Sequence, residues 1–510
     1  MVIEKTRNTI YGSIFGIVNK LILILFPFII RTLIIKNLGE DYAGLNNLFS
    51  SIIEILSLAE LGFGSAMVYC MYKPIACNNE KKVRALLMYY KNIYLFIGAI
   101  IFIVGIFLTP LIQYIIFGNT PKDVNLKLLF LIYLINSSCS YFALAYRSSI
   151  LIAHQRNDLK YITHSIILVL MYIIQIFVLI SSKNYYLYII FMPIFTIITN
   201  IVTSFISKLF YPQYYPNGKI SNDEKKEIKN LLKSLIGHKI GAVVLNATDN
   251  LIISSFLGLS FVAIYGNYYY IMNAVFSMVY IIAQSMTSGI ANSIIINSKE
   301  YNEKLLMNLL FAFSILVGIC SNCLANLYQI FMRIWVGDKL VLPYYYVILF
   351  VIYFYIRSIR YVILIFKDAC GMWRADFWKP YIESLTNLIV NITLVLITKE
   401  MWGIILSSIL SMIFVALPWE IHVLYKNFFK KKTTQYYINL IWFLIINIVI
   451  VFIGVILCNF IDNLFINSYI NLFSKLIIII IESIFLLYIF YSKTKYFSYW
   501  KHKFFNKINS

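Results

Sequence analysis

The sequence predicts an all-α integral membrane protein with about fourteen transmembrane helices. Of its 510 residues, 61% are hydrophobic and only 13% are charged, and the mean hydropathy is +0.80. Ordinary soluble domains are about 45–50% apolar and about 25% charged. The chain therefore lacks the polar residues to cover soluble domains. This composition excludes a soluble enzyme, a nucleic-acid-binding domain and a secreted disulfide scaffold, and the net charge of +21 reflects basic cytoplasmic loops.

A membrane helix needs about 20 mostly apolar residues, and the chain offers about fourteen such stretches. They lie near 10–35, 43–71, 92–117, 126–150, 161–182, 185–208, 234–257, 261–296, 305–332, 342–366, 380–398, 402–425, 437–461 and 471–491. With the N-terminus in the cytoplasm, most of the 43 Lys and Arg residues fall in cytoplasmic segments. The alternation predicts an even number of spans and two cytoplasmic termini.

The longest loop predicts a boundary between two halves. It runs over 211–233 and contains Pro and Gly, followed by Ser221 and Glu224 in the spacing of a helix-capping box. We expect a cytoplasmic linker with a short charged helix here. The predicted domains are a six-helix bundle, this linker, a second six-helix bundle, helices 13 and 14, and a basic cytoplasmic tail. Their bounds are 1–210, 211–233, 234–425, 426–491 and 492–510.

The two halves resemble each other in sequence. Leu33-Ile-Ile-Lys-Asn-Leu-Gly39 recurs as Leu251-Ile-Ile-Ser-Ser-Phe-Leu-Gly258, with one residue inserted before the glycine. Six helices separate equivalent positions, so the halves have the same orientation in the membrane. Parallel repeats of this kind occur in transporters. The sequence thus predicts two parallel-repeat bundles around a central cavity, with two additional C-terminal helices.

Several charged and polar residues fall inside predicted spans. A charge at mid-bilayer costs about 2.5–3.5 kcal/mol, so these side chains must face a polar cavity or one another. Lys20 and Arg31 share nearly one face of the first helix, and span 7 carries a polar stripe. The candidate cavity residues are Lys20, Arg31, His238, Lys239, Asn246, Asp249 and Asn250. Structural ion pairs between helices are the alternative interpretation.

The acidic residues divide into two groups. Glu54 and Glu60 lie within span 2, where a carboxyl group suits cation coupling or an ion pair with Lys20 or Arg31. Other titratable groups lie near predicted span ends, where we expect them to meet headgroups or water. They are Glu383, Glu420, His422 and Glu482. No catalytic constellation, cofactor motif or metal spacing is predicted, and the Cys320-x-x-Cys323 pair fits plain packing.

The order of motifs resembles the polysaccharide biosynthesis and export proteins, which are the O-antigen and capsule flippases of the multidrug/oligosaccharidyl-lipid/polysaccharide exporter superfamily. Four stretches carry this resemblance. They are Arg31–Ala76 with its Leu56-Ser-Leu-Ala-Glu-Leu-Gly-Phe-Gly-Ser-Ala66 core, Tyr146–Gln155, Asp249–Tyr268 and Trp373–Asn387. The sequence departs from the family after Trp402-Gly403, where Ile-Ile-Leu-Ser-Ser-Ile replaces a Gly-Thr-containing turn.

The resemblance implies a MATE-like fold and a non-enzymatic function. Such proteins move an undecaprenyl-pyrophosphate-linked oligosaccharide from the inner to the outer leaflet of the bacterial cytoplasmic membrane, for O-antigen, capsule or exopolysaccharide synthesis. Arg31 and Lys20, with Lys239 opposite, would attract the pyrophosphate. The implied partners are membrane lipids, a polysaccharide polymerase and chain-length machinery, with no nucleic acid and no cofactor. A cation-coupled multidrug antiporter and, with less support, a membrane glycosyltransferase or polymerase are the alternatives.

Overall fold

The regular structure in the described part of the chain is entirely helical in the computed structural model. The structure describes residues 2–60, 62–118, 120–372, 375–462, 464 and 467–508. For a subset of these, only the backbone is described. This subset is 2–10, 230, 231, 233–239, 242, 246 and 502–508. The all-α fold class predicted from the composition is therefore confirmed.

The chain divides into two compact units, which we call unit 1 (Met1–Ala263) and unit 2 (Ile264–Ser510). Unit 1 contains the first nine α-helices and the start of α10. These helices are α1 (Val2–Asn37), α2 (Glu40–Leu56), α3 (Phe63–Ala76), α4 (Glu80–Leu108), α5 (Leu126–Phe142), α6 (Ser148–Ala153), α7 (Asn157–Ser181), α8 (Tyr185–Phe210), α9 (Asn222–Phe256) and α10 (Leu259–Ile296). The domain bounds taken from the sequence stay a prediction.

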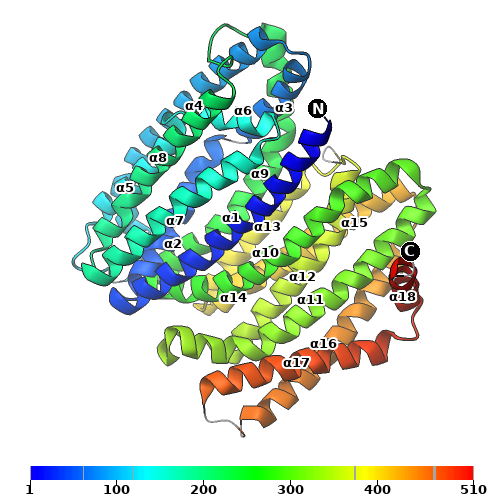
Figure 1. Ribbon diagram of the computed structural model, residues 1–510. Coiled ribbons are helices and arrows are strands. Elements are labelled where there is room, and N and C mark those ends of the chain that lie inside the picture. Colours follow the sequence, from blue (N-terminus) through cyan, green and yellow to red (C-terminus); the bar gives the residue numbers. More distant parts are fainter. Residues whose placement is uncertain are drawn as a thin grey trace. The chain divides into compact units, whose positions relative to one another are not determined.

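Unit 2 contains the rest of α10 and all later helices (Figure 1). These are α11 (Lys299–Val336), α12 (Tyr344–Ala369), α13 (Lys379–Thr398), α14 (Trp402–Ser411), α15 (Leu417–Leu424), α16 (Thr434–Asp462), α17 (Ser468–Tyr491) and α18 (Lys495–Ile508). Two π-helical segments, Met412–Ala416 and Tyr425–Phe429, follow α14 and α15.

The helices match the predicted spans. Among the described residues, 12 helices are long and apolar enough to cross a membrane, or 13 with the pair α5 and α6, which is bent by 48°. The seventh predicted span corresponds to a shorter apolar stretch of α9, Val243–Phe256. The chain is thus a multi-pass membrane protein, while the number of spans and the repeat stay predictions.

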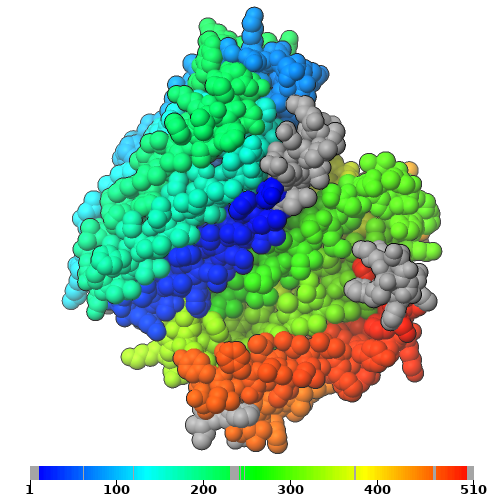
Figure 2. All heavy atoms as spheres, viewed as in Figure 1, coloured from blue at the N-terminus to red at the C-terminus, as the bar shows by residue number. Residues whose placement is uncertain are grey.

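The surface of α17 illustrates why such helices suit lipid. Phe473, Ile477, Ile481 and Phe485 on this helix are each more than half exposed. Figure 2 shows α17, in orange-red, on the surface of unit 2. In water such a face would be unfavourable, but hydrocarbon chains cover apolar side chains without cost. The exposed apolar face is what a lipid-facing helix requires.

The second predicted span is broken near its middle. Helix α2 ends at Leu56, a 3₁₀ turn (Ser57–Glu60) follows, and α3 starts at Phe63. Gly62 has a φ of 78°, in the left-handed region that glycine adopts at little cost. A broken helix is tolerated at membrane depth where its free backbone groups find partners inside the protein. This break places Glu60 at the end of a turn rather than inside a regular helix.

The predicted capping box is present at the start of α9. The Ser221 side chain accepts a hydrogen bond from the Glu224 backbone, and the Glu224 side chain accepts one from the Ser221 backbone. The short separate helix expected here is wrong in one respect, because α9 continues without a break to Phe256. No proline interrupts the charged segment, so its helix runs on into the apolar one.

The linker and the start of α9 contact side chains of α4 and the residue that follows α6. Arg84 on α4 donates to the Gln213 carbonyl at 2.8 Å, and Lys82 pairs with Glu224 at 2.6 Å. His154, just after α6, stacks on Tyr211 with 4.1 Å between ring centroids. Burial lowers the pKa of His154 to about 4. The hydrogen bond from Lys82 lowers the pKa of Glu224.

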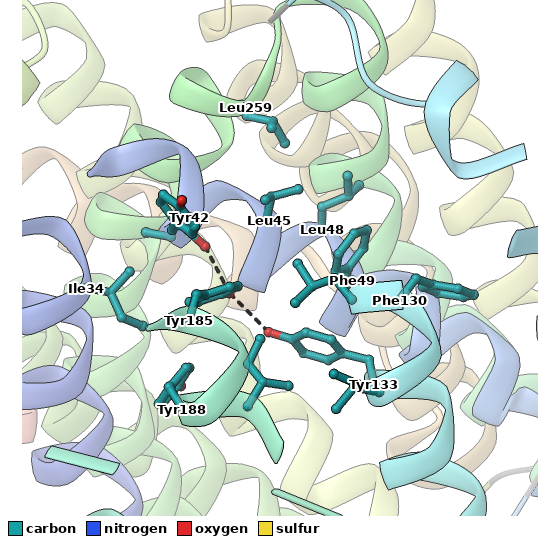
Figure 3. Close-up of a cluster of buried hydrophobic side chains, with 14 of the residues drawn as sticks. Ile34, Tyr42, Leu45, Leu48, Phe49, Phe130, Tyr133, Tyr185, Tyr188 and Leu259 are labelled. Atoms are coloured by element: carbon teal, nitrogen blue, oxygen red, sulfur yellow. Dashed lines mark hydrogen bonds between the residues drawn. The ribbon is translucent and has the colours of Figure 1, made fainter. Parts of the chain in front are cut away.

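The core of unit 1 combines aromatic packing with buried hydroxyl groups (Figure 3). The Tyr185 hydroxyl donates to the Tyr42 carbonyl at 3.1 Å and lies 3.3 Å from the Tyr133 hydroxyl. Phe49 packs edge-on against the Tyr133 ring, with centroids 5.5 Å apart. Buried hydroxyls need such partners, because an unsatisfied one would destabilise the fold. These contacts join α2, α5 and α8 within unit 1.

Candidate functional site

Arg31 is one of the buried charged residues of unit 1. It lies on α1 and is 8% exposed. Its Nη1 donates to Asn47 Oδ1 on α2 at 3.0 Å, and its Nη2 donates to the carbonyl of Ala263 on α10 at 3.0 Å. Asn47 is itself fixed by donating to the Val262 carbonyl at 3.3 Å. Three helices of unit 1 therefore hold this guanidinium in a defined position.

Lys20 has different surroundings from Arg31, although both lie on nearly one face of α1. The Lys20 side chain is exposed. The residue beside it, Asn19, is buried and donates to Ser165 on α7 at 2.9 Å. Helix α1 packs along α7 in Figure 1. Helical position alone predicted a shared environment, and the structure shows that the neighbouring helices cover only Arg31.

The polar stripe predicted in span 7 lies on α9. Asp249 is buried, and Asn250 is half-buried and donates to the Ser51 hydroxyl on α2 at 2.9 Å. The side chains of His238, Lys239 and Asn246 lie outside the described part of the structure. The described end of the stripe thus faces α2 within unit 1.

Glu60 is surrounded by tyrosine hydroxyl groups. It accepts hydrogen bonds from Tyr94 at 2.9 Å and from Tyr141 at 3.3 Å. A Cβ atom on Gly64 would lie 2.9 Å from the Tyr90 hydroxyl and 3.2 Å from Glu60 Oε1. The absence of a side chain at this glycine therefore leaves room for the hydroxyls and the carboxyl to converge. The tyrosines, rather than Lys20 or Arg31, supply these two contacts.

Glu54 is separated from this cluster. Its side chain is exposed on α2, whereas Glu60 is half-buried in the turn that follows. The two carboxyl groups predicted for cation coupling therefore occupy different environments, and Glu60 is the one built into a polar cluster.

Unit 2 contains a buried charge cluster that the sequence reasoning missed. Arg360 on α12 donates to Glu420 on α15 at 2.7 Å and to Glu383 on α13 at 2.9 Å. Lys379 also contacts both carboxylates, Glu383 at 2.9 Å and Glu420 at 2.7 Å. Glu383 is 2% and Glu420 0% exposed. The two positive and two negative charges compensate one another.

The expectation that Glu383, Glu420 and Glu482 meet headgroups or water is therefore wrong. Glu482 is buried and accepts from Asn322 Nδ2 at 2.7 Å. A usable signal was present in the i,i+4 spacing of Lys379 and Glu383. The contacts of Glu420 come from helices far away in sequence and leave no local pattern. His422, in contrast, is exposed.

A metal site is not evident in the described residues. No group of three or more His, Cys, Asp or Glu side chains there is placed to hold a metal ion. The chemistry that the charged clusters offer is hydrogen bonding and charge compensation inside a membrane-spanning fold.

Comparison with known proteins gives similarity of structure without similarity of sequence. No protein-family model matches the sequence, and no curated protein is significantly similar to it in sequence. The lipid II flippase MurJ in an inward closed conformation has a TM-score of 0.70 at 16% identity, covering 95% of this chain and 99% of that chain.

Two transporters are also similar in structure. An inward-facing multidrug resistance MATE family transporter of the MOP superfamily has a TM-score of 0.60 at 12% identity, covering 78% of this chain and 94% of its own. The Vibrio cholerae MATE transporter VcmN in the bent form has a TM-score of 0.51 at 14% identity, covering 84% of this chain and 97% of its own. The chain therefore has the fold shared by the flippase MurJ and the MATE transporters of the MOP superfamily.

Proposed function

We propose that the chain is a flippase that moves undecaprenyl-pyrophosphate-linked oligosaccharides from the cytoplasmic to the outer leaflet of the bacterial cytoplasmic membrane. One observation carries the proposal, which is the buried guanidinium of Arg31 in a fold similar to that of the lipid II flippase MurJ. The structural similarity covers 95% of this chain. Transport would proceed by alternating access, and the division into two compact units supplies two bodies for such a motion.

The proposed roles follow from charge. The pyrophosphate is anionic, and guanidinium and ammonium groups bind phosphate oxygens by charge-assisted hydrogen bonds. We assign this role to Arg31 and Lys20, with Lys239 as a third cation. The polar stripe on α9 would contact the glycan through His238, Asn246, Asp249 and Asn250. We assign cation coupling to Glu60, with Glu54 as the less favoured site because it lies outside the tyrosine cluster.

The test is leaflet transfer in liposomes. The purified full chain is reconstituted with a fluorescent undecaprenyl-pyrophosphate oligosaccharide, and accessibility to an impermeant quencher is followed with time. We expect protein-dependent transfer that falls to background in Arg31→Ala. A matched control is Arg333→Ala, because Arg333 is an exposed arginine outside the proposed site. Unchanged transfer by folded Arg31→Ala protein would overturn the assignment of Arg31.

A second candidate is a cation-coupled multidrug antiporter. It is favoured by the similarity to MATE transporters and by the tyrosine-bound Glu60. Efflux of a cationic dye without transfer of the lipid-linked glycan would support it. In either case Glu60→Gln, which keeps the shape of the side chain but removes its negative charge, should remove the response of transport to a cation gradient.

A further inference from the structure

Arg357 is a second guanidinium inside a membrane-spanning helix of unit 2. It lies near the middle of α12 and is partly exposed. Its Nη1 donates to the Tyr269 hydroxyl at 3.2 Å and to Asn273 Oδ1 at 3.3 Å, both on α10. Its Cζ lies 3.9 Å from the centroid of the Phe276 ring. Among the described residues of unit 2, Arg357 forms no ion pair with a carboxylate.

Only one nitrogen of the Arg357 guanidinium donates hydrogen bonds to described residues of unit 2. Both hydrogen bonds involve Nη1, and the edge formed by Nε and Nη2 donates to no residue described in unit 2. This edge presents two parallel N–H groups, which is the geometry that binds a carboxylate through two hydrogen bonds. Within the described part of unit 2, the guanidinium is therefore held by neutral groups alone, through Nη1 and ring contacts.

Aromatic residues surround the guanidinium at helical spacing. Tyr269, Asn273, Phe276 and Tyr280 follow one another by four, three and four residues, so they form one stripe on α10. The Tyr361 ring of α12 packs edge-on against Tyr280, with centroids 4.9 Å apart. All of these except Phe276 are partly exposed.

Such a stripe does not suit lipid. It combines hydroxyl groups, an amide and one charge, and an intramembrane charge usually faces a polar space rather than hydrocarbon. The exposed parts of the tyrosines offer flat ring faces together with hydroxyl donors. Ring faces pack against the C–H faces of sugars, and hydroxyl and amide groups bind sugar hydroxyls. The combination therefore fits a carbohydrate better than a lipid chain.

We propose that Arg357 and the stripe of Tyr269, Asn273, Phe276 and Tyr280 form a sugar subsite that binds an acidic sugar through its carboxylate. The Nε and Nη2 edge binds the carboxylate, and the rings pack against the sugar. This inference rests on the proposed function and deepens it, because it names the chemical class of glycan that unit 2 recognises.

The charge of the subsite distinguishes this ligand from the pyrophosphate. A pyrophosphate carries several negative charges and is usually bound by more than one cation. Here one guanidinium supplies the charge, and one of its two sides is already hydrogen-bonded. A single free edge matches the single charge and planar shape of a hexuronate carboxylate.

The test compares an acidic sugar with its neutral counterpart. The full chain in lipid nanodiscs is titrated with 4-nitrophenyl β-glucuronide and 4-nitrophenyl β-glucoside. We expect the glucuronide to bind more tightly, and Arg357→Gln to weaken its binding about tenfold while leaving the glucoside unchanged, because one bidentate pair is lost. Equal binding of both sugars by the wild type, or an equal effect of the variant on both, would overturn the subsite.

Two further variants separate binding from folding. Arg357→Lys keeps the charge but removes the bidentate edge, so it should weaken glucuronide binding by a smaller factor and serves if Arg357→Gln does not fold. Arg333→Gln removes an exposed charge elsewhere in unit 2 and should change neither sugar. Retention of full glucuronide binding by folded Arg357→Lys and Arg357→Gln would also overturn the proposal.

A transport experiment tests this proposal separately from the flippase assignment. Undecaprenyl-pyrophosphate disaccharides ending in glucuronate or glucose are compared in the liposome assay. If the wild type transfers neither lipid but binds the glucuronide through Arg357, the subsite stands and the flippase assignment fails. If both lipids are transferred and Arg357→Gln slows them alike, the flippase stands and the acidic-sugar subsite fails.

Discussion

Arg357 and Arg360 lie one helical turn apart on α12, yet their partners differ completely. Arg360 contacts two carboxylates, Glu383 and Glu420, and is 9% exposed. Arg357 contacts a hydroxyl, an amide and an aromatic ring, and is partly exposed. A guanidinium compensated by carboxylates holds helices together, whereas one held by neutral groups keeps its charge for a ligand. Partner chemistry, more than position in the membrane, separates structural charges from binding charges.

The largest effect is expected from removing one carboxylate of the buried charge cluster around Arg360. Glu420→Gln leaves Arg360 and Lys379 with one carboxylate between them. Because removal of one partner leaves an uncompensated buried charge, we expect a loss of about 3–5 kcal/mol in stability. Thermal melting of the detergent-solubilised protein measures this change.

The control for this variant is an exposed ion pair of the same unit. Asp338→Asn removes the partner of Arg333, and both side chains are mostly exposed, so we expect a change of about 0–1 kcal/mol. If Glu420→Gln melts at the wild-type temperature, the buried cluster does not hold α12, α13 and α15 together.

The second prediction concerns a variant that gives Arg357 a carboxylate partner. Asn273→Asp places a carboxylate where an amide oxygen now accepts from Arg357 at 3.3 Å. Arg357 then resembles Arg360, so we expect glucuronide affinity to fall about tenfold and the melting temperature to stay the same or rise. Asn297→Asp adds the same charge at an exposed position just after α10 and should leave affinity unchanged. Undiminished affinity in Asn273→Asp contradicts the comparison.

Two glycines also differ in their surroundings, because one has close neighbours where a side chain would lie and the other has none. A Cβ atom on Gly44 would lie 2.3 Å from the carbonyl oxygen of Leu259, so α2 has no room for a side chain there. We expect Gly44→Ala to destabilise the protein by about 1–3 kcal/mol in melting experiments. Gly289 on α10 has nothing within 4 Å, and Gly289→Ala should stabilise the helix by about 0.5–1 kcal/mol. Equal melting temperatures would show that α2 can shift.

The smallest effect is expected at the linker, where charges lie near water. The pKa values of both Glu224 and His154 are lowered in the folded state. Their contributions are present above the unfolded pKa values and are lost as the pH falls, for His154 between about 6.5 and about 4. We expect the protection factors of residues 211–221 against hydrogen exchange to fall over this range, by less than about 1 kcal/mol. A His154→Gln variant without this response confirms the group, and an unaltered response in that variant excludes it.

Most of the helices could be predicted from the sequence, because most apolar stretches are long enough to form a helix in lipid. The helix start at Ser221 was also predictable, since the capping box is contained within four residues. The continuation of α9 through the charged segment was not predicted, because the Pro and Gly residues of the loop indicate a boundary. These residues lie before Ser221, and no proline interrupts the helix after it.

The candidate site was less predictable because partners come from distant segments. The partners of Arg360 lie 23 and 60 residues away, on α13 and α15, so hydropathy near each residue could not show that they are buried together. Helical periodicity placed Lys20 and Arg31 on one face but could not show which neighbours cover that face. Tyr94 and Tyr141 around Glu60 belong to other helices and leave no mark near Glu60 itself.

The bond from Arg31 to the Ala263 carbonyl has a consequence for biosynthesis. The two residues are 232 positions apart, so Arg31 enters the membrane long before this acceptor has been synthesised. At about 5–20 residues per second, the interval is roughly 10 to 50 seconds. During that time, water, lipid headgroups or an insertion factor must shield the guanidinium of the nascent chain. A nascent chain stalled before residue 263 would therefore contain an Arg31 that has not yet reached this acceptor.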